Sequence, residues 1–169
     1  MRKIKIWTDG SARTQSPRHG GCGAYILEDT EESYISRGFS PTTTSRMEIM
    51  ALLLALKAVR GDTACDVQVY SDSQYVVNAI KEGWIYRWQR RMWMGVKNSD
   101  LWKELIQVIS ERPYMRLTID WVKGHHKSLE NDIVFGNHIA DSLSSYKNFE
   151  EYKRDLGYEV GQIQTSDRG

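Results

Sequence analysis

Three acidic residues stand where their side chains could hold a divalent cation together. Asp9 directly follows the apolar alternation of residues 3–8, and Asp72 directly follows a second alternating segment at 66–71. Glu48 lies near the start of a helical pattern between these two segments. Mg²⁺ takes a few carboxylates and keeps several waters, so two strand ends and one helix end that meet would suit it.

Each of these residues also has an ordinary structural explanation. An Asp at the end of a strand commonly makes a turn or caps the next helix. Ser45 and Glu48 have the spacing of a capping box. Glu48 follows Met47, a residue of the apolar helix face, so its side chain is expected at the edge of the sheet. The three carboxylates need further support before they count as a site.

The elements that must position these residues follow from the spacing of the apolar residues. Alternation predicts strands at 3–8, 20–29, 33–39, 66–71 and 115–122, and three- and four-residue spacing predicts helices at 47–58, 73–81, 99–112 and 137–146. Three consecutive strands predict an antiparallel meander, and the later alternation of helix and strand predicts parallel strands. The fold class is thus α/β, one mixed sheet with helices on both faces and its chemistry at the carboxyl ends of the parallel strands.

The composition fits one soluble domain. The chain has 169 residues, of which 40% are apolar and 27% charged, a mixture typical of globular proteins. The longest uninterrupted apolar stretch, residues 49–56, is far shorter than the roughly 20 residues that cross a bilayer. Two cysteines give no disulfide framework. We therefore expect a cytoplasmic protein with no membrane partner, monomeric by default.

The charge is nearly balanced overall but unevenly distributed. The net charge is +1, yet residues 81–103 hold six basic and two acidic side chains. Four of the six tryptophans lie in the same window. Basic and aromatic side chains together are typical of a surface that contacts a polyanion, although paired tryptophans also pack in cores.

Short sequence blocks around these residues follow one another in a specific order. They are T-D-G-S at 8–11, T-T-T-S-R-M-E at 42–48, Y-S-D-S-Q-Y-V at 70–76, K-N-S-D-L-W at 97–102, W-V-K-G-H at 121–125 and G-Y-E-V at 157–160. That order resembles ribonuclease H of type 1 over the chain apart from its last nine residues. The resemblance implies a mixed five-stranded sheet and an endonuclease that cuts the RNA strand of RNA–DNA hybrids, leaving 5′-phosphate and 3′-hydroxyl ends.

The resemblance also implies two divalent ions held by four acidic residues. Three of the four positions fall on Asp9, Glu48 and Asp72, with Mg²⁺ as the expected ion and Mn²⁺ as a substitute. The fourth falls on Asn137, which offers a neutral carbonyl oxygen and no charge. At about 4 Å and an effective dielectric near 20, one unit charge is worth roughly 4 kcal/mol before desolvation. The ion beside Asn137 is therefore expected to bind more weakly.

Asn137 has competing explanations. It is natural, or it is an engineered change that traps substrate, or Asp132 or Asp141 takes its place. Asp141 lies one helical turn after Asn137, with Cβ atoms about 5–6 Å apart, and this separation is the objection to it. We favour Asn137 as the fourth metal ligand and count it among the catalytic residues.

A histidine and several polar residues complete the site that the resemblance implies. His125 aligns with the loop histidine that the family uses near the attacking water or in product release, where a histidine can carry a proton near neutral pH; His126 is the alternative. The residues expected to contact the RNA strand are Gln15, Thr44 and Gln74, those expected to hold a DNA phosphate are Thr43 and Asn98, and those of the basic protrusion are Trp84, Arg87, Trp88, Arg90, Arg91 and Trp93. Pro41 stands where an Arg often joins the phosphate pocket.

The sequence thus predicts a metal-dependent ribonuclease H, with a catalytic domain at 1–160 and a polar tail at 161–169. Substrate choice is expected to depend on hybrid geometry, because A-form-like RNA displays its 2′-hydroxyls in a wide, shallow minor groove. Two alternatives stay open. One is another nuclease of the same fold, and the other is a hybrid-binding protein that cleaves little because Asn137 replaces an acidic metal ligand.

Overall fold

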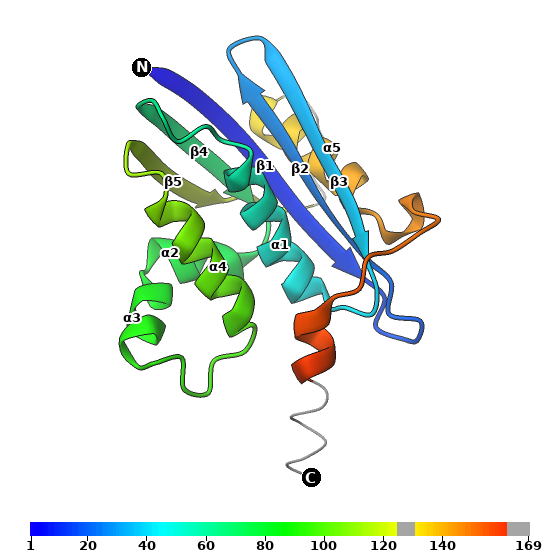
Figure 1. Cartoon of the computed structure of the whole chain (residues 1–169). Helices are drawn as coiled ribbons and strands as arrows, with labels where there is room; N and C mark the ends of the chain where they lie inside the picture. Colours follow the sequence, from blue (N-terminus) through cyan, green and yellow to red (C-terminus); the bar gives the residue numbers. More distant parts are fainter. Residues whose placement is uncertain (125–130, 162–169) are drawn as a thin grey trace.

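The computed structural model describes residues 1–124 and 131–161 of the chain. Its strands are β1 (Arg2–Ala12), β2 (Gly20–Glu28), β3 (Glu31–Phe39), β4 (Cys65–Ser71) and β5 (Met115–Trp121), and its helices are α1 (Thr44–Lys57), α2 (Gln74–Lys81), α3 (Trp84–Arg90), α4 (Ser99–Ser110), α5 (Asp132–Ser144) and the short 3-10 turn η1 (Tyr146–Asn148). The strands form one sheet in the order β3-β2-β1-β4-β5 (Figure 1). β3, β2 and β1 are antiparallel, whereas β1, β4 and β5 are parallel. The predicted mixed five-stranded sheet is confirmed.

Helices cover both faces of this sheet, as predicted (Figure 1). Residues of β1 alternate between the two faces, since successive side chains of a strand point to opposite sides. Ile4 and Ile6 belong to a cluster with residues of α1, α2 and α4. Trp7 points to the other face, where its Nε1 donates to the carbonyl oxygen of Ile133 in α5 at 2.9 Å. Asp9, two residues further on, shares the face of Trp7 and therefore faces α5.

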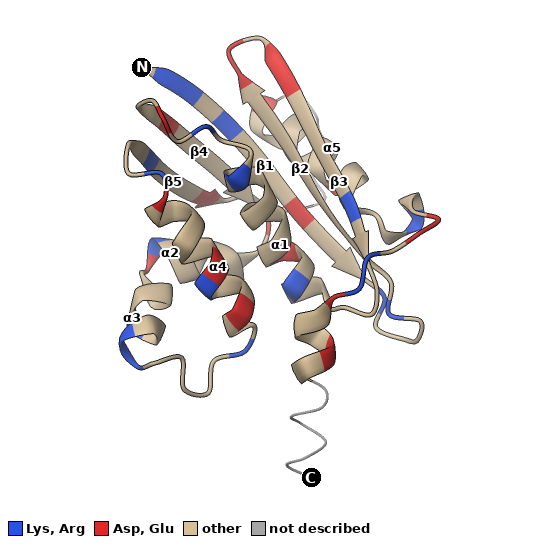
Figure 2. Ribbon diagram, in the orientation of Figure 1, with Lys and Arg blue, Asp and Glu red and all other residues tan. Residues whose placement is uncertain are grey.

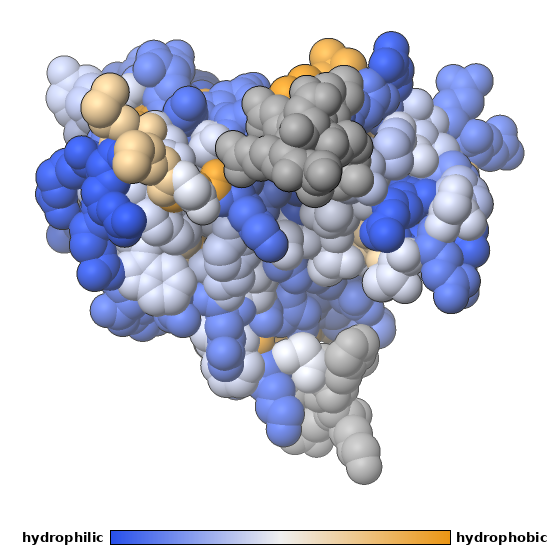
Figure 3. Space-filling view, turned by 90° about the horizontal axis from the view of Figure 1, so that it is seen from below, coloured by the Kyte–Doolittle hydropathy of each residue, from blue (hydrophilic) through white to orange (hydrophobic). Residues whose placement is uncertain are grey.

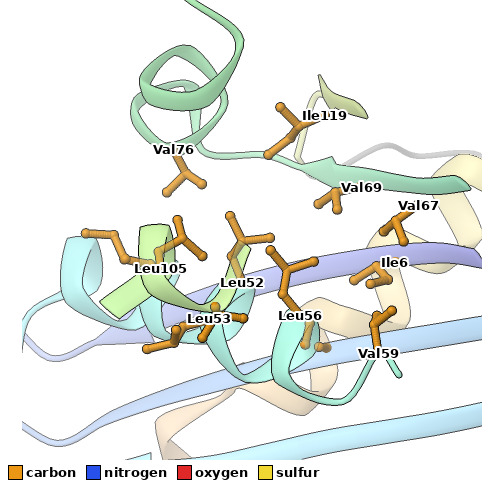
Figure 4. Close-up of a cluster of buried hydrophobic side chains, with 14 of the residues drawn as sticks. Ile6, Leu52, Leu53, Leu56, Val59, Val67, Val69, Val76, Leu105 and Ile119 are labelled. Atoms are coloured by element: carbon orange, nitrogen blue, oxygen red, sulfur yellow. The ribbon is translucent and has the colours of Figure 1, made fainter. Parts of the chain in front are cut away.

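The main core lies between the sheet and helices α1, α2 and α4. Figure 4 shows side chains from the strands, such as Ile6 and Val69, meeting Leu52 and Leu56 of α1 and Val76 of α2. All five are fully buried, and burying one such side chain stabilises the fold by about 1.5–3 kcal/mol. This packing fixes the position of α1 and α2 relative to the ends of β1 and β4.

The first strand is longer than predicted. Pairing with β2 continues to Ala12 opposite Gly20, so Asp9 lies within β1 and not after its end. The parallel pairing with β4, however, stops at Thr8 opposite Ser71. The consequence for the site is small, because Asp9 still stands just beyond the end of the parallel pair.

The last predicted helix begins earlier than the sequence indicates. The apolar spacing predicts residues 137–146, but α5 spans Asp132–Ser144. The reason is an N-cap, since the Asn131 side chain accepts a hydrogen bond from the backbone N–H of Ile133 at 2.8 Å. A further helical stretch at 156–161 follows η1, and only the first residue of the predicted tail lies within the described part of the chain.

The exterior seen from below is largely hydrophilic, with small separated apolar areas (Figure 3). Within residues 1–124 and 131–161, no helix has the length and hydrophobicity needed to cross a bilayer.

Candidate active site

The ends of the two central parallel strands bring Asp9 and Asp72 together. The last paired residues are Thr8 of β1 and Ser71 of β4. Asp9 directly follows Thr8, and Asp72 directly follows Ser71. Asp9 is only 6% exposed, and its Oδ1 accepts a hydrogen bond from the backbone N–H of Gly10 at 2.8 Å. The carboxyl ends of adjacent parallel strands are the expected place for chemistry in such a sheet.

Glu48 joins them because α1 packs directly on β1. A Cβ at Gly10 would collide with the backbone at Glu48, so only glycine allows this close approach. Glu48 Oε2 accepts a hydrogen bond from Ser73 Oγ at 2.8 Å, and Ser73 follows Asp72. The capping-box explanation of Glu48 is wrong, because Thr43 and not Ser45 caps α1.

The electrostatics place the three carboxyls in one neighbourhood. Burial raises the pKa of Asp9 to about 9, and the charge of Asp72 is the next cause of the shift. Burial also raises the pKa of Glu48, against the effect of the Ser73 hydrogen bond, and the charge of Asp72 adds to the rise. Asp72 therefore acts on both of the other carboxyls, as neighbouring like charges do.

Helix α5 faces Asp9 from the face of the sheet that is opposite to α1. Trp7 bonds to Ile133 and Ser11 Oγ donates to the carbonyl oxygen of Ser144 at 2.7 Å. Asp9 lies midway between Trp7 and Ser11 on the same strand face, so it stands opposite the middle of α5. The α5 residues at that level are the two candidates for the fourth ligand.

Both candidates are at the site. Asp141 shares a hydrogen bond with Asp9 and adds its charge, and each effect raises the pKa of Asp9. The objection that Asp141 lies too far along the helix is therefore wrong. Asn137 is 5% exposed, and its Oδ1 is a buried atom for which the described structure gives no hydrogen-bond partner. A buried acceptor without a donor is costly, and a cation is one group that would satisfy it.

The residues present fit a divalent ion by their chemistry. Carboxylate and amide oxygens are the ligands that Mg²⁺ takes, and a cation would favour the ionised form of the crowded Asp9 carboxyl. In the described parts of the chain, no three His, Cys, Asp or Glu side chains are already arranged round a single point as a metal site.

The predicted loop histidine, His125, lies outside the described residues, as does its alternative His126. Gly124, the residue before His125, lies against the cluster. A Cβ at Gly124 would be 3.0 Å from Oδ2 of Asp72. The chain therefore enters the histidine segment beside an acidic residue of the site.

The predicted substrate contacts surround the same end of the sheet. Gln15 is exposed in the connection from β1 to β2, and Gln74 is exposed at the start of α2, just after Asp72. Thr43 and exposed Thr44 stand at the start of α1. Polar side chains that can bond to hydroxyls thus lie in one connection and at the starts of two helices at this end of the sheet.

The predicted basic protrusion divides into two parts with different surroundings. Trp84, Trp88 and Trp93 are half-buried and pack against the main core, and the Trp88 ring lies 5.8 Å from that of Trp102 between centroids. The exposed residues are Arg87, Arg90 and Arg91. Figure 2 shows basic residues, coloured blue on the ribbon, at α3 and in the loop that follows it. The tryptophans hold the segment on the domain, while the arginines face outward.

Two residues that support the site or its surroundings were missed from the sequence. Trp121, which is 45% exposed, donates from Nε1 to the backbone carbonyl oxygen of Asp72 at 3.1 Å. Arg46, inside the first turn of α1, is 4% exposed. Nothing in the periodicity indicates the Trp121 bond, whereas Arg46 occupies a position on the buried face of a helix, which is unusual enough for an arginine to be a signal.

Comparison with known proteins gives consistent matches. A family model described as RNase H matches residues 1–148. A ribonuclease H of Moorella thermoacetica is 40% identical over 139 residues, covering 78% of this chain and 86% of that protein. A ribonuclease H of Enterobacter sp. (strain 638) is 36% identical over 165 residues, covering 95% of this chain and 98% of that protein. The crystal structure of LC11-RNase H1 in complex with RNA/DNA hybrid shares the fold, with a TM-score of 0.62 and 23% identity over 83% of this chain and 93% of that one.

Proposed function

The chain belongs to the ribonuclease H family, and from this premise we propose that it cleaves the RNA strand of RNA–DNA hybrids with the help of divalent metal ions. The observation that carries the proposal is the meeting of Asp9, Glu48 and Asp72 at the ends of the central strands, with α5 facing them. We assign the chain to type 1 of the family on the order of its sequence blocks.

We propose that Asp9, Glu48 and Asp72 hold Mg²⁺, or Mn²⁺ in its place, together with α5. The fourth carboxylate is Asp141, because it already interacts with Asp9. Asn137, one turn earlier, adds a neutral buried oxygen that has no other partner in the described structure. The sequence alone favours Asn137 as the fourth ligand. We propose Asp141 for that role instead, with Asn137 as a neighbour of the ions.

When bound, two divalent ions supply an activated water and stabilise the leaving 3′ oxygen, so that cleavage leaves 5′-phosphate and 3′-hydroxyl ends. The chain's own residues set up this chemistry. Ser73 holds one carboxylate oxygen of Glu48, and the Gly10 N–H holds one of Asp9. Gly124 lies beside Asp72, and His125 is the next residue in the sequence. We propose that His125 moves a proton near the attacking water or the product.

Hybrid recognition is proposed for the surrounding polar residues. Gln15, Thr44 and Gln74 contact 2′-hydroxyls of the RNA strand, which distinguish RNA from DNA. Thr43 and Asn98 hold a phosphate of the DNA strand. The arginines of the protrusion, which face solvent, add electrostatic affinity that weakens with salt, while their tryptophan neighbours keep the segment in place and add ring surface for the DNA strand.

The test is digestion of an end-labelled RNA–DNA hybrid in Mg²⁺ and in Mn²⁺, beside duplex DNA, duplex RNA and single-stranded RNA. We expect cleavage of the hybrid RNA alone, with a 5′-phosphate on each new end. Asp72→Asn should abolish cleavage. The matched control is Asp66→Asn, which changes an aspartate inside β4 whose carboxylate pairs with Arg116 at 2.7 Å, outside the site.

A hybrid that shifts on a gel while its RNA stays intact would favour the binding-only alternative. That alternative depends on the loss of an acidic ligand at Asn137, and the interaction of Asp141 with Asp9 supports an acidic ligand from α5 instead. A catalytic domain at 1–160 and a monomeric, cytoplasmic enzyme remain predictions.

A further inference from the structure

A buried arginine links the two residues proposed to hold a DNA phosphate. The backbone N–H of Arg46 donates to Thr43 Oγ1 at 3.2 Å, and its Nη1 donates to Asn98 Oδ1 at 3.4 Å. Thr43 and Asn98 stand at the starts of different helices, α1 and α4. Asn98 has a left-handed backbone with φ of 61°, and its side chain does not cap α4. Its amide is instead directed to Arg46.

The remaining donors of Arg46 go to two carboxylates. Nε and Nη2 donate to Asp155 at 2.7 and 2.9 Å, and Nη1 and Nη2 donate to Asp100 at 2.9 and 2.7 Å. With the bond to Asn98, all five N–H groups of the guanidinium have acceptors. Two carboxylates also outweigh its single positive charge. Arg46 is therefore a structural link and has no N–H left for a phosphate.

Asp155 reaches this cluster from a segment far along the chain. It is 4% exposed and also accepts a hydrogen bond from Thr42 Oγ1 at 2.6 Å. Two residues earlier, Lys153 forms a parallel bridge to the end of β3. Two residues later, Gly157 packs so closely that a Cβ there would collide with Arg46. Residues 153–157 are thus fixed to the edge of the sheet and to the arginine.

We propose that residues 153–157, acting through Asp155 and Arg46, position Thr43 and Asn98 to donate hydrogen bonds to one phosphate of the DNA strand. Because both side-chain oxygens accept from Arg46, the Thr43 hydroxyl hydrogen and the Asn98 amide hydrogens remain available as donors, which an anion needs. Asp155 and Arg46 are positioning residues that do not touch the substrate. This inference rests on the proposed function and names how one of its subsites is held.

Asp155→Asn is the first test. It keeps the size of the side chain but removes its charge and one of the oxygens that Arg46 uses. The KM for the hybrid should rise about tenfold, the factor that one hydrogen bond to a charged group supplies, while kcat and the Mg²⁺ midpoint stay unchanged. Glu159→Gln is the matched control, because it breaks an exposed ion pair with Arg154 in the same region, and it should leave KM unchanged.

A series of hybrids with a single neutral methylphosphonate linkage at successive DNA positions locates the effect. At one position the neutral linkage should weaken wild-type binding, and at that position Asp155→Asn should cause no further loss. If the loss of binding caused by Asp155→Asn adds to the loss caused by the neutral linkage at every position, the proposal is overturned. A general loss of stability would produce this result, because it affects all substrates alike.

Asp100→Asn provides a second variant, because the Asp100 side chain is 50% exposed and its replacement leaves the buried Asp155 bonds intact. It should show the same position-specific loss with a smaller rise in KM, and it decides the question if Asp155→Asn does not fold. An unchanged KM for both variants would also overturn the proposal. If the wild-type protein leaves hybrids intact, the proposed function fails; if it cleaves them but the losses add, only the positioning role fails.

Discussion

Replacing Asp9 with asparagine should stabilise the metal-free protein at alkaline pH while abolishing cleavage. The pKa of Asp9 in the folded protein is raised to about 9, by burial first and then by Asp72, whereas an unfolded Asp titrates near 3.9. Between these values the folded protein keeps a proton that the unfolded chain has released. The Asp9 contribution to stability is therefore complete below about pH 4 and is lost as the pH rises toward 9.

The size of this pH effect on stability follows from the one proton that the folded and unfolded states bind differently. Over the window between the two pKa values, the free energy of unfolding should fall by about 1.4 kcal/mol per pH unit because of Asp9. Asparagine has no such titration, and its Oδ1 can still accept from the Gly10 N–H. The difference between variant and wild type should therefore widen steadily from pH 5 to pH 8, up to this slope.

Urea unfolding in a chelator at several pH values measures this difference. Asp66→Asn is a control of opposite sign, since hydrogen bonding to Arg116 lowers the pKa of Asp66 and so adds stability that is present at neutral pH and lost in acid. If Asp9→Asn and the wild type keep a constant difference between pH 5 and 8, then Asp9 is ionised in the folded protein and the crowding of carboxyls is refuted.

Three further substitutions test the packing and charge of α5. Asp141→Asn should raise the Mg²⁺ midpoint of cleavage at least about tenfold, because it removes a charge beside Asp9; an unchanged midpoint would remove Asp141 from the metal site. Asn137→Asp should lower the same midpoint, and an unchanged metal titration would argue that Asn137 is no ligand. Gly136→Ala should lower the urea midpoint, since the collision of its Cβ with Trp7 costs about 1–3 kcal/mol, more than the helix gains from alanine, about 1 kcal/mol. A higher urea midpoint would contradict this packing.

Local patterns could identify the elements that carry the three carboxylates. Alternating segments before Asp9 and Asp72 identify two strands, and the helical spacing near Glu48 identifies the element between them. Parallel strands bring their carboxyl ends to one edge of the sheet. The grouping of the three carboxylates into one site also needed the order of the sequence blocks that resembles ribonuclease H, because the packing of α1 on β1, which brings Glu48 to the strand ends, is a contact between distant parts of the chain.

The choice between Asn137 and Asp141 could not be predicted in this way. The reach of Asp141 depends on how closely α5 approaches the sheet, which the apolar spacing of one helix does not reveal. Gly136 packs on Trp7, and Gly23, the partner of Asp9 in β2, packs on the backbone of α5 near Ala140. Glycines on both contact surfaces let the helix lie close to β1. These glycines are the one feature of the sequence that indicates so close an approach of α5, but their packing partners are known only from the fold.

The role of Arg46 could not be predicted from the sequence, for a different reason. Its partners Asp100 and Asp155 come from α4 and from the segment after η1, so the pairing exists only in the folded chain. Breaking a buried ion pair by removing one partner commonly costs several kcal/mol, because it leaves an uncompensated charge. The sequence shows one arginine on an apolar helix face, and only the fold shows what neutralises it.

The crowding at Asp9 links the stability of the protein to the cation it uses. Near neutral pH the folded state without metal must either hold a proton on Asp9 or place its charge beside Asp72. An ion that binds only the folded state stabilises it by mass action, by about 2.7 kcal/mol at a concentration a hundredfold above its Kd. The ion does so through the same carboxyls whose repulsion opposes folding. Removing a carboxylate therefore raises stability without metal and lowers the gain from metal, so the two effects share one cause.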